Sequence, residues 1–95
     1  MSGGHFNYDQ YLIKTISDSI QSVIDRNDST EKDEYGYTVG RGYSPETIAR
    51  FRKAVEVLER ASIYAQRIDW LLSDDDGEDT FAQRLDRELA DHAKR

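Results

Sequence analysis

The side chains best suited to binding chemistry in this chain are tyrosines and arginines interspersed with glycines. Tyrosine rings stack on flat ligands while their hydroxyl groups bond to polar edges. Glycine lets backbone N–H groups approach an anion, and arginine makes a two-pronged contact with phosphate oxygens. These residue types are typical of a nucleotide pocket, and they predict a ligand site formed by Gly3, Gly4, His5, Tyr8, Tyr11, Arg26, Tyr37, Arg41 and Tyr43. The alternative is that the tyrosines cover the ends of a thin helical core.

The stretch from Ser2 to Tyr11 is the densest part of this set, with two glycines, a histidine and three aromatic residues before a helical pattern. Helix capping explains some of it. Asn7 suits the N-cap and Gln10 the returning bond, while Phe6 and Tyr11 occupy the positions of a hydrophobic staple. No such local role accounts for the rest, which makes site candidates of Gly3, Gly4, His5 and Tyr8.

Catalytic and metal-binding signatures are weak in this sequence. It has no cysteine, no GxSxG motif and no phosphate-loop motif. The acidic run before Gly77 resembles a calcium loop, but Leu72 and Gln83 stand where that loop requires acidic ligands. We therefore expect a protein that is not an enzyme and uses no metal or cofactor. A hydrolase built around His5 is the least favoured alternative.

These candidates must be positioned by helices. Hydrophobic spacing predicts three, over about residues 8–26, 45–72 and 78–93, with a loop at 27–43 whose second half favours a short extended piece or a small hairpin. Ser44 and Pro45 mark the start of the central helix, which is about 42 Å long at 1.5 Å per residue. The fold class is all-α: a single domain over residues 1–95, built as a small helical bundle with a long central helix.

Burial in this bundle is expected to be incomplete within one chain, because apolar residues are 37% and charged residues 34% of the sequence. One apolar face is predicted on the first helix, formed by Leu12, Ile16, Ile20, Val23 and Ile24. The central helix carries two apolar stripes. The first comprises Ile48, Phe51, Val55, Leu58, Ala65, Ile68 and Leu72, and the second comprises Val57, Ala61, Tyr64 and Leu71. Two stripes on one helix predict more than one neighbour, so we expect a homo-oligomer.

The net charge of −6 argues against binding to a nucleic-acid backbone, because that affinity comes from clustered lysine and arginine. No apolar run approaches the roughly 20 residues that span a bilayer, and no signal peptide is visible. We therefore expect a cytoplasmic protein without DNA or membrane as a partner.

Three segments together carry a resemblance to a known family. They are Ser2–Tyr8 (SGGHFNY), Tyr64–Leu72 (YAQRIDWLL) and Asp75–Phe81 (DDGEDTF), and the likeness covers nearly the whole chain outside residues 27–43. The chain resembles a family of small, mostly uncharacterised proteins of phages, prophages and bacteria, which implies no particular activity or site. In architecture it is also similar to phage anti-CBASS sponges, small helical oligomers that sequester cyclic dinucleotides without cleaving them.

Two functions remain open from the sequence. The first is a phage-type, anti-defence binding protein that sequesters a small anionic ligand, such as a signalling nucleotide, between protomers. The second is an acidic interaction module or inhibitor that occupies a basic surface of a host protein, based on the net charge and the acidic run at 74–79. Trp70 and its neighbours either pack in the core and between subunits or anchor such a partner.

Overall fold

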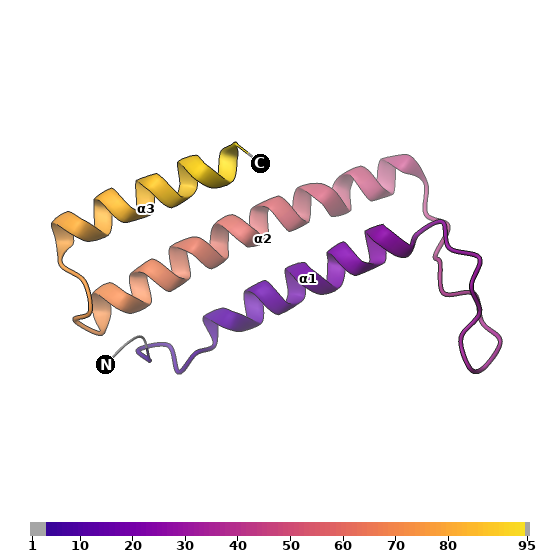
Figure 1. Ribbon diagram of the computed structural model, residues 1–95, viewed down its shortest axis with the longest axis horizontal. Coiled ribbons are helices and arrows are strands. Elements are labelled where there is room, and N and C mark those ends of the chain that lie inside the picture. Colours follow the sequence, from indigo (N-terminus) through magenta and orange to yellow (C-terminus); the bar gives the residue numbers. More distant parts are fainter. Residues whose placement is uncertain (1–3, 95) are drawn as a thin grey trace.

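The computed structural model describes residues 4–94, and the chain is all-helical over that range, without strands (Figure 1). α1 spans Gln10–Arg26, α2 spans Pro45–Leu72 and α3 spans Glu78–Ala93. The long α2 lies in the middle, with α1 and α3 along its two sides. Within the described range, α1 and α3 pack against α2 and not against each other. The predicted all-α class is therefore confirmed.

The molecule is a flat layer, measuring 52 × 28 × 14 Å. Its thickness is little more than the diameter of one helix with side chains, about 10–12 Å. The radius of gyration is 17.3 Å, whereas a compact domain of this length has about 12 Å. Among the described apolar residues, Ile24 and Ile48 alone are buried, with 8% and 6% of their surface exposed. The core is thus a narrow seam between α1 and α2.

This seam follows a seven-residue spacing. On α1 the buried residues are Gln10, Ser17 and Ile24, and on α2 Ile48 and Asp69 are buried, three such intervals apart. The spacing is that of paired helices in a coiled coil. Several seam positions are polar, which limits how much apolar surface the pair can bury.

The predicted apolar face of α1 is wrong in part. Ile20 and Ile24 do lie in the seam, but Leu12 is 59% exposed and Ile16 is 52% exposed. The physical reason is that α1 carries two apolar stripes and α2 covers only one of them. Leu12 and Ile16 belong to the uncovered stripe.

The predicted start of the first helix is also wrong. The N-cap is Asp9, not Asn7, and its side chain makes no capping hydrogen bond. Asn7 and Tyr8 have φ angles of 55° and 63°, so they form a left-handed turn before the helix. Gln10 is buried and donates from Nε2 to Oε1 of Gln66 at 3.1 Å, so it returns no bond to a cap. With the cap moved by two residues, Phe6 and Tyr11 are no longer at staple positions.

The other two helices begin and end where the sequence places them. Ser44 Oγ accepts a hydrogen bond from the Thr47 N–H at 3.3 Å, and Pro45 opens α2. At the start of α3, Thr80 Oγ1 accepts from the Gly77 N–H at 3.2 Å. Both starts satisfy backbone donors that a helix leaves unpaired.

Candidate functional site

Asp69 organises the N-terminal end of the layer. Near the end of α2 it is fully buried, at 0% exposure. Its carboxylate accepts hydrogen bonds from the Gly4 N–H at 3.0 and 3.2 Å and from the Phe6 N–H at 3.0 Å. The N–H of His5, between them, donates to Ser73 Oγ at 3.2 Å. A buried carboxylate is thereby satisfied by backbone donors, and the N-terminal segment is fixed to α2.

Two of the N-terminal site candidates, Gly4 and His5, therefore have structural roles. Gly4 has a φ of 128°, a conformation that side chains disfavour, and its N–H is bonded to Asp69 instead of facing a ligand. The His5 ring meets the Phe6 ring edge-on at 5.1 Å. Tyr8 and Tyr11 are more than half exposed and stack on each other at 6.1 Å. Gly3 lies outside the described residues.

The connection between α1 and α2 forms a small hairpin at the other end of the layer. One antiparallel bridge joins Lys32 to Thr38, and the turn is organised by Asp33. Asp33 Oδ1 accepts from the N–H groups of Tyr35 at 2.9 Å and Tyr37 at 3.0 Å. Both tyrosine rings are more than 70% exposed at the tip. Tyr37 is thus presented to solvent on an ordered turn.

Asn27 and Gly40 fix this hairpin to the end of α1. The Asn27 side chain accepts from the Tyr43 N–H at 2.8 Å and donates to the Tyr43 carbonyl at 3.0 Å. Gly40 passes so close to α1 that a Cβ would lie 2.4 Å from the Ser29 carbonyl oxygen and 2.8 Å from that of Arg26. The Tyr43 ring packs edge-on against Phe51 at 5.6 Å. Tyr43 therefore contributes to packing, although 41% of it stays exposed.

The two arginines of the predicted site line one hollow. It has a volume of about 150 Å³ and is lined by Ser22, Val23, Arg26, Val39 and Arg41, from the end of α1 and the segment that follows the hairpin. No acidic residue lines it. With the residues described, neither guanidinium forms an ion pair. Two cations without carboxylate partners make this hollow the best candidate for an anion.

The nine predicted site residues do not form one pocket within a chain. The described N-terminal candidates lie at one end of the layer, while Arg26, Arg41, Tyr43 and the hairpin lie at the other (Figure 1). α1 separates the two groups, and its 17 residues span roughly 25 Å. A ligand contacting both groups would need more than one protomer.

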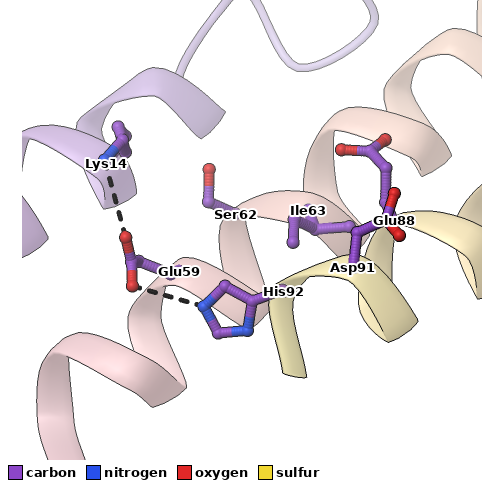
Figure 2. A pocket seen from close by; sticks show the side chains of 7 residues that line it. All are labelled: Lys14, Glu59, Ser62, Ile63, Glu88, Asp91 and His92. Carbon is purple, nitrogen blue, oxygen red and sulfur yellow. Dashed lines mark hydrogen bonds and ion pairs between the residues drawn. The ribbon is translucent and has the colours of Figure 1, made fainter. Parts of the chain in front are cut away.

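A second group of polar side chains, which the sequence did not predict, lines a groove of about 250 Å³ between α1 and α3 (Figure 2). Glu59 on α2 lies at its centre. One carboxylate oxygen is 3.8 Å from Lys14 Nζ and the other is 3.3 Å from His92 Nε2. In Figure 2 the Ser62 hydroxyl points away from the His92 ring, so no serine–histidine pair is formed. The carboxylate links all three helices and holds the imidazole in place.

These residues had no detectable signal in the sequence, because Glu59 and His92 lie 33 positions apart. Asp69 had one: it is a lone acid inside the apolar end of a helix, on the same seven-residue spacing as Ile48. Among the residues described, no three acidic or histidine side chains are arranged to hold a metal ion.

The acidic run after α2 is partly occupied by the chain itself. The side chain of Asp76 is 3% exposed and accepts a hydrogen bond from Thr80 Oγ1. Arg84 approaches the same carboxylate at 3.4 Å. Nearby, the Arg67 guanidinium lies 4.8 Å from the centre of the Trp70 ring and pairs with Glu88. Asp76 and Trp70 therefore have roles in joining α2 to α3.

Comparisons with protein families, curated protein sequences and solved structures found no match to this chain. No helix in residues 4–94 combines the length and the apolar character required to cross a lipid bilayer. The resemblances drawn from the sequence therefore stay predictions, and a functional proposal rests on the geometry of the sites.

Proposed function

We propose that this protein binds a small anionic ligand, such as a nucleotide, without converting it. The observation that supports the proposal is the hollow in which Arg26 and Arg41 lie together with no acidic residue in its lining. A guanidinium presents a planar set of donors that matches phosphate oxygens, and two of them can neutralise two negative charges. The ordered hairpin beside the hollow offers Tyr37 for stacking on a base.

The connection between α1 and α2 positions the two arginines. Asn27 and Gly40 hold the Arg41 segment against the end of α1, so the two arginines are brought together before any ligand arrives. Prior organisation of a site lowers the entropy that binding must overcome. Sequestration in the cytoplasm, in the manner of the phage sponges that the chain resembles in architecture, is the biological role that fits such a site.

Titration calorimetry with a panel of cyclic and linear nucleotides, together with inorganic phosphate, tests the proposal. A charge-assisted hydrogen bond contributes about 1.5–3 kcal/mol, so replacing both arginines by alanine is expected to weaken binding by at least about 100-fold. Arg26→Lys keeps the positive charge but removes the two-pronged hydrogen bonding of the guanidinium. We expect it to weaken binding by less than Arg26→Ala. Arg87→Ala, at an exposed position on α3, is the matched control and should bind as the wild type does.

Two results would overturn the proposal. One is the absence of heat and of a thermal shift with every compound in the panel. The other is binding that persists unchanged when both Arg26 and Arg41 are replaced. A response to inorganic phosphate alone would restrict the ligand class to simple anions.

A second candidate, an acidic module that occupies a basic protein surface, has support from Asp74, Glu78 and Asp79, which are exposed in the turn and first residues of α3. Asp76 takes no part in it, because its carboxylate is engaged by Thr80 and Arg84. Loss of capture of a basic partner in an Asp74→Asn, Asp79→Asn variant would favour this candidate. Capture that survives the change would exclude the acidic mechanism.

We also propose that the working form is a homo-oligomer. Support comes from the narrow seam between α1 and α2, which leaves much of the apolar side-chain surface of the layer in contact with water. A domain normally buries such surface in a second packed layer.

A further inference from the structure

One broad face of the layer carries uncovered apolar side chains. The ion pair between Lys14 and Glu59 marks the opposite face, on which the groove between α1 and α3 lies. On a helix each residue advances by about 100°, so a residue two positions away points about 160° from its neighbour. Leu12 and Ile16 stand in that relation to Lys14, and Val57 and Ala61 stand in it to Glu59. The apolar side chains of both helices therefore share the face away from the groove.

We define this patch as Leu12, Ile16, Val57, Ala61 and Tyr64, and an apolar hollow is lined by residues next to it in sequence on the same two helices, Ile13 and Ala65. Leu12, Ile16, Val57 and Tyr64 are between 41% and 59% exposed. The hollow is lined by Phe6, Ile13 and Ala65, among others, where the N-terminal segment meets the two helices. Patch and hollow together form an extended surface of the kind that marks an interface.

The total accessible surface of the chain indicates how much area a partner would have to bury. The accessible area is 6996 Å², whereas a folded monomer of 11.0 kDa has about 5,600 Å². The difference is about 1,400 Å², and a standard interface buries about 800 Å² on each partner. One additional copy on the patch, burying an interface of that size, would remove a little over half of this excess.

We propose that a second copy of this chain occupies the patch in a two-fold, face-to-face dimer whose helices run antiparallel to their counterparts. The proposal rests on the homo-oligomer proposed above and specifies its arrangement. The contact between Lys14 and Glu59 shows that the centre of the α1 stripe is level with the centre of the α2 stripe. A single two-fold axis across both helices at that level pairs α1 with α1 and α2 with α2.

A parallel arrangement, with the axis along α2, would satisfy the patch less well. It would place Leu12 and Ile16 of one chain over α3 of the other, and the exposed side chains of α3 are mostly polar or charged. In the antiparallel arrangement Leu12 and Ile16 meet their own counterparts instead. The apolar surface of α1 thus has an apolar partner in one of the two arrangements only.

Charge also favours the antiparallel arrangement. Residues 74–79 carry five acidic side chains and no basic one, whereas residues 44–53 carry three basic side chains and one acidic one. These segments lie at opposite ends of α2, and antiparallel pairing brings the acidic end of one chain level with the basic end of the other. A parallel pair would superpose like charges at both ends, which opposes association.

Cysteine substitution provides the test, because the sequence contains no cysteine of its own. Sedimentation equilibrium of the wild-type chain at micromolar concentration should give the mass of two chains. Ala61→Cys lies near the proposed axis and should cross-link to itself. Spin labels at Ala49→Cys, near the start of α2, should be separated by roughly 30–35 Å along the helices, from 1.5 Å per residue on each side of the axis.

The possible results distinguish a failure of the antiparallel arrangement from a failure of the homo-oligomer proposal. A one-chain mass overturns both proposals, and the patch would then be left to a different partner. A two-chain mass with spin labels closer than about 20 Å overturns the antiparallel arrangement and leaves the homo-oligomer standing. If Ala61→Cys fails to cross-link in a two-chain species, the chains associate through another face. That result also overturns the proposed arrangement and leaves the homo-oligomer standing.

Charged substitutions give an independent readout. Leu12→Glu combined with Ile16→Glu should raise the dimer dissociation constant at least 100-fold while leaving the circular dichroism of the helices unchanged, because both residues are exposed in the single chain. Thr15→Glu, at an exposed position between them on the outer edge of α1, is the matched control and should dimerise normally. Equal dissociation constants for the two variants would contradict the proposed interface.

Discussion

Replacing Asp69 by alanine is the perturbation with the largest effect on stability that the structure predicts. The change removes a fully buried carboxylate and leaves the N–H groups of Gly4 and Phe6 without their acceptor. Each of these part-buried backbone donors costs up to about 1–3 kcal/mol when it loses its partner, and the deleted side chain leaves a small cavity besides. We expect a loss of about 3–5 kcal/mol, a large share of the 5–15 kcal/mol typical of a whole domain.

Thermal unfolding and amide hydrogen exchange measure this effect. For a domain of this size 1 kcal/mol corresponds to about 4–8 °C, so the melting temperature should fall by at least about 12 °C. Exchange should accelerate first at Gly4 and Phe6. Asp69→Asn, which retains one acceptor oxygen, is expected to lie between alanine and the wild type.

Asp86→Ala is the matched control, because Asp86 is an exposed acid on α3, and its loss should change stability by no more than about 0.5 kcal/mol. If the alanine variant at position 69 is too unstable to study, Ser73→Ala gives a milder test. It removes the acceptor of the His5 N–H and should cost about 1 kcal/mol. Asp69→Ala with unchanged melting and unchanged exchange at Gly4 and Phe6 would refute this account of the N-terminal segment.

Further predictions concern the hairpin and the helix start. Gly40→Ala should destabilise the chain by more than about 2 kcal/mol, because its Cβ would collide with backbone carbonyl oxygens; Gly77→Ala, whose Cβ would meet nothing closer than 3.9 Å, should cost less than about 1 kcal/mol in the same chemical denaturation experiment. Asn27→Ala removes both side-chain hydrogen bonds to Tyr43 and should cost about 1–3 kcal/mol, with faster exchange at the Tyr43 amide; an unchanged Tyr43 amide would argue against the bridge. Ser44→Ala should lower stability by about 1 kcal/mol through loss of the α2 cap, and equal melting of variant and wild type would contradict that role.

The helices could be predicted from the sequence where local chemistry decides them. Ser44 and Pro45 define the start of α2 by side-chain and ring geometry alone, and the structure follows them. The start of α1 could not be predicted in this way. Its position depends on Asp69, a residue about 60 positions later, whose carboxylate holds Gly4 and Phe6 and so leads the chain through the turn at Asn7.

The buried face of α1 could not be predicted from the sequence of that helix alone either. Leu12 and Ile16 are more apolar than Gln10 and Ser17, yet the latter pair lies in the seam. The deciding feature is the seven-residue spacing shared with α2, because it keeps the contact line straight along two long helices. That spacing was present in the sequence, but a search for apolar residues alone misses it. The apolar stripe that remains exposed is the strongest indication of a second copy.

At the candidate site too, the residue types could be predicted from the sequence, but their tertiary partners could not. The meeting of Arg26 and Arg41 depends on a hairpin seated by Asn27 and Gly40, and 15 residues separate the two arginines in the chain. The glycine and histidine of the N-terminal segment resembled ligand contacts because their partners, Asp69 for Gly4 and Ser73 for His5, lie at the far end of another helix. Residue type indicated binding, whereas the tertiary partners show which donors are still available.

The flat layer is proposed to be half of a larger unit, and the mass of the wild-type chain in solution tests this claim. Sedimentation equilibrium at micromolar concentration is expected to give twice the mass of one chain, 11.0 kDa. A single species of 11.0 kDa across the micromolar range would contradict the claim.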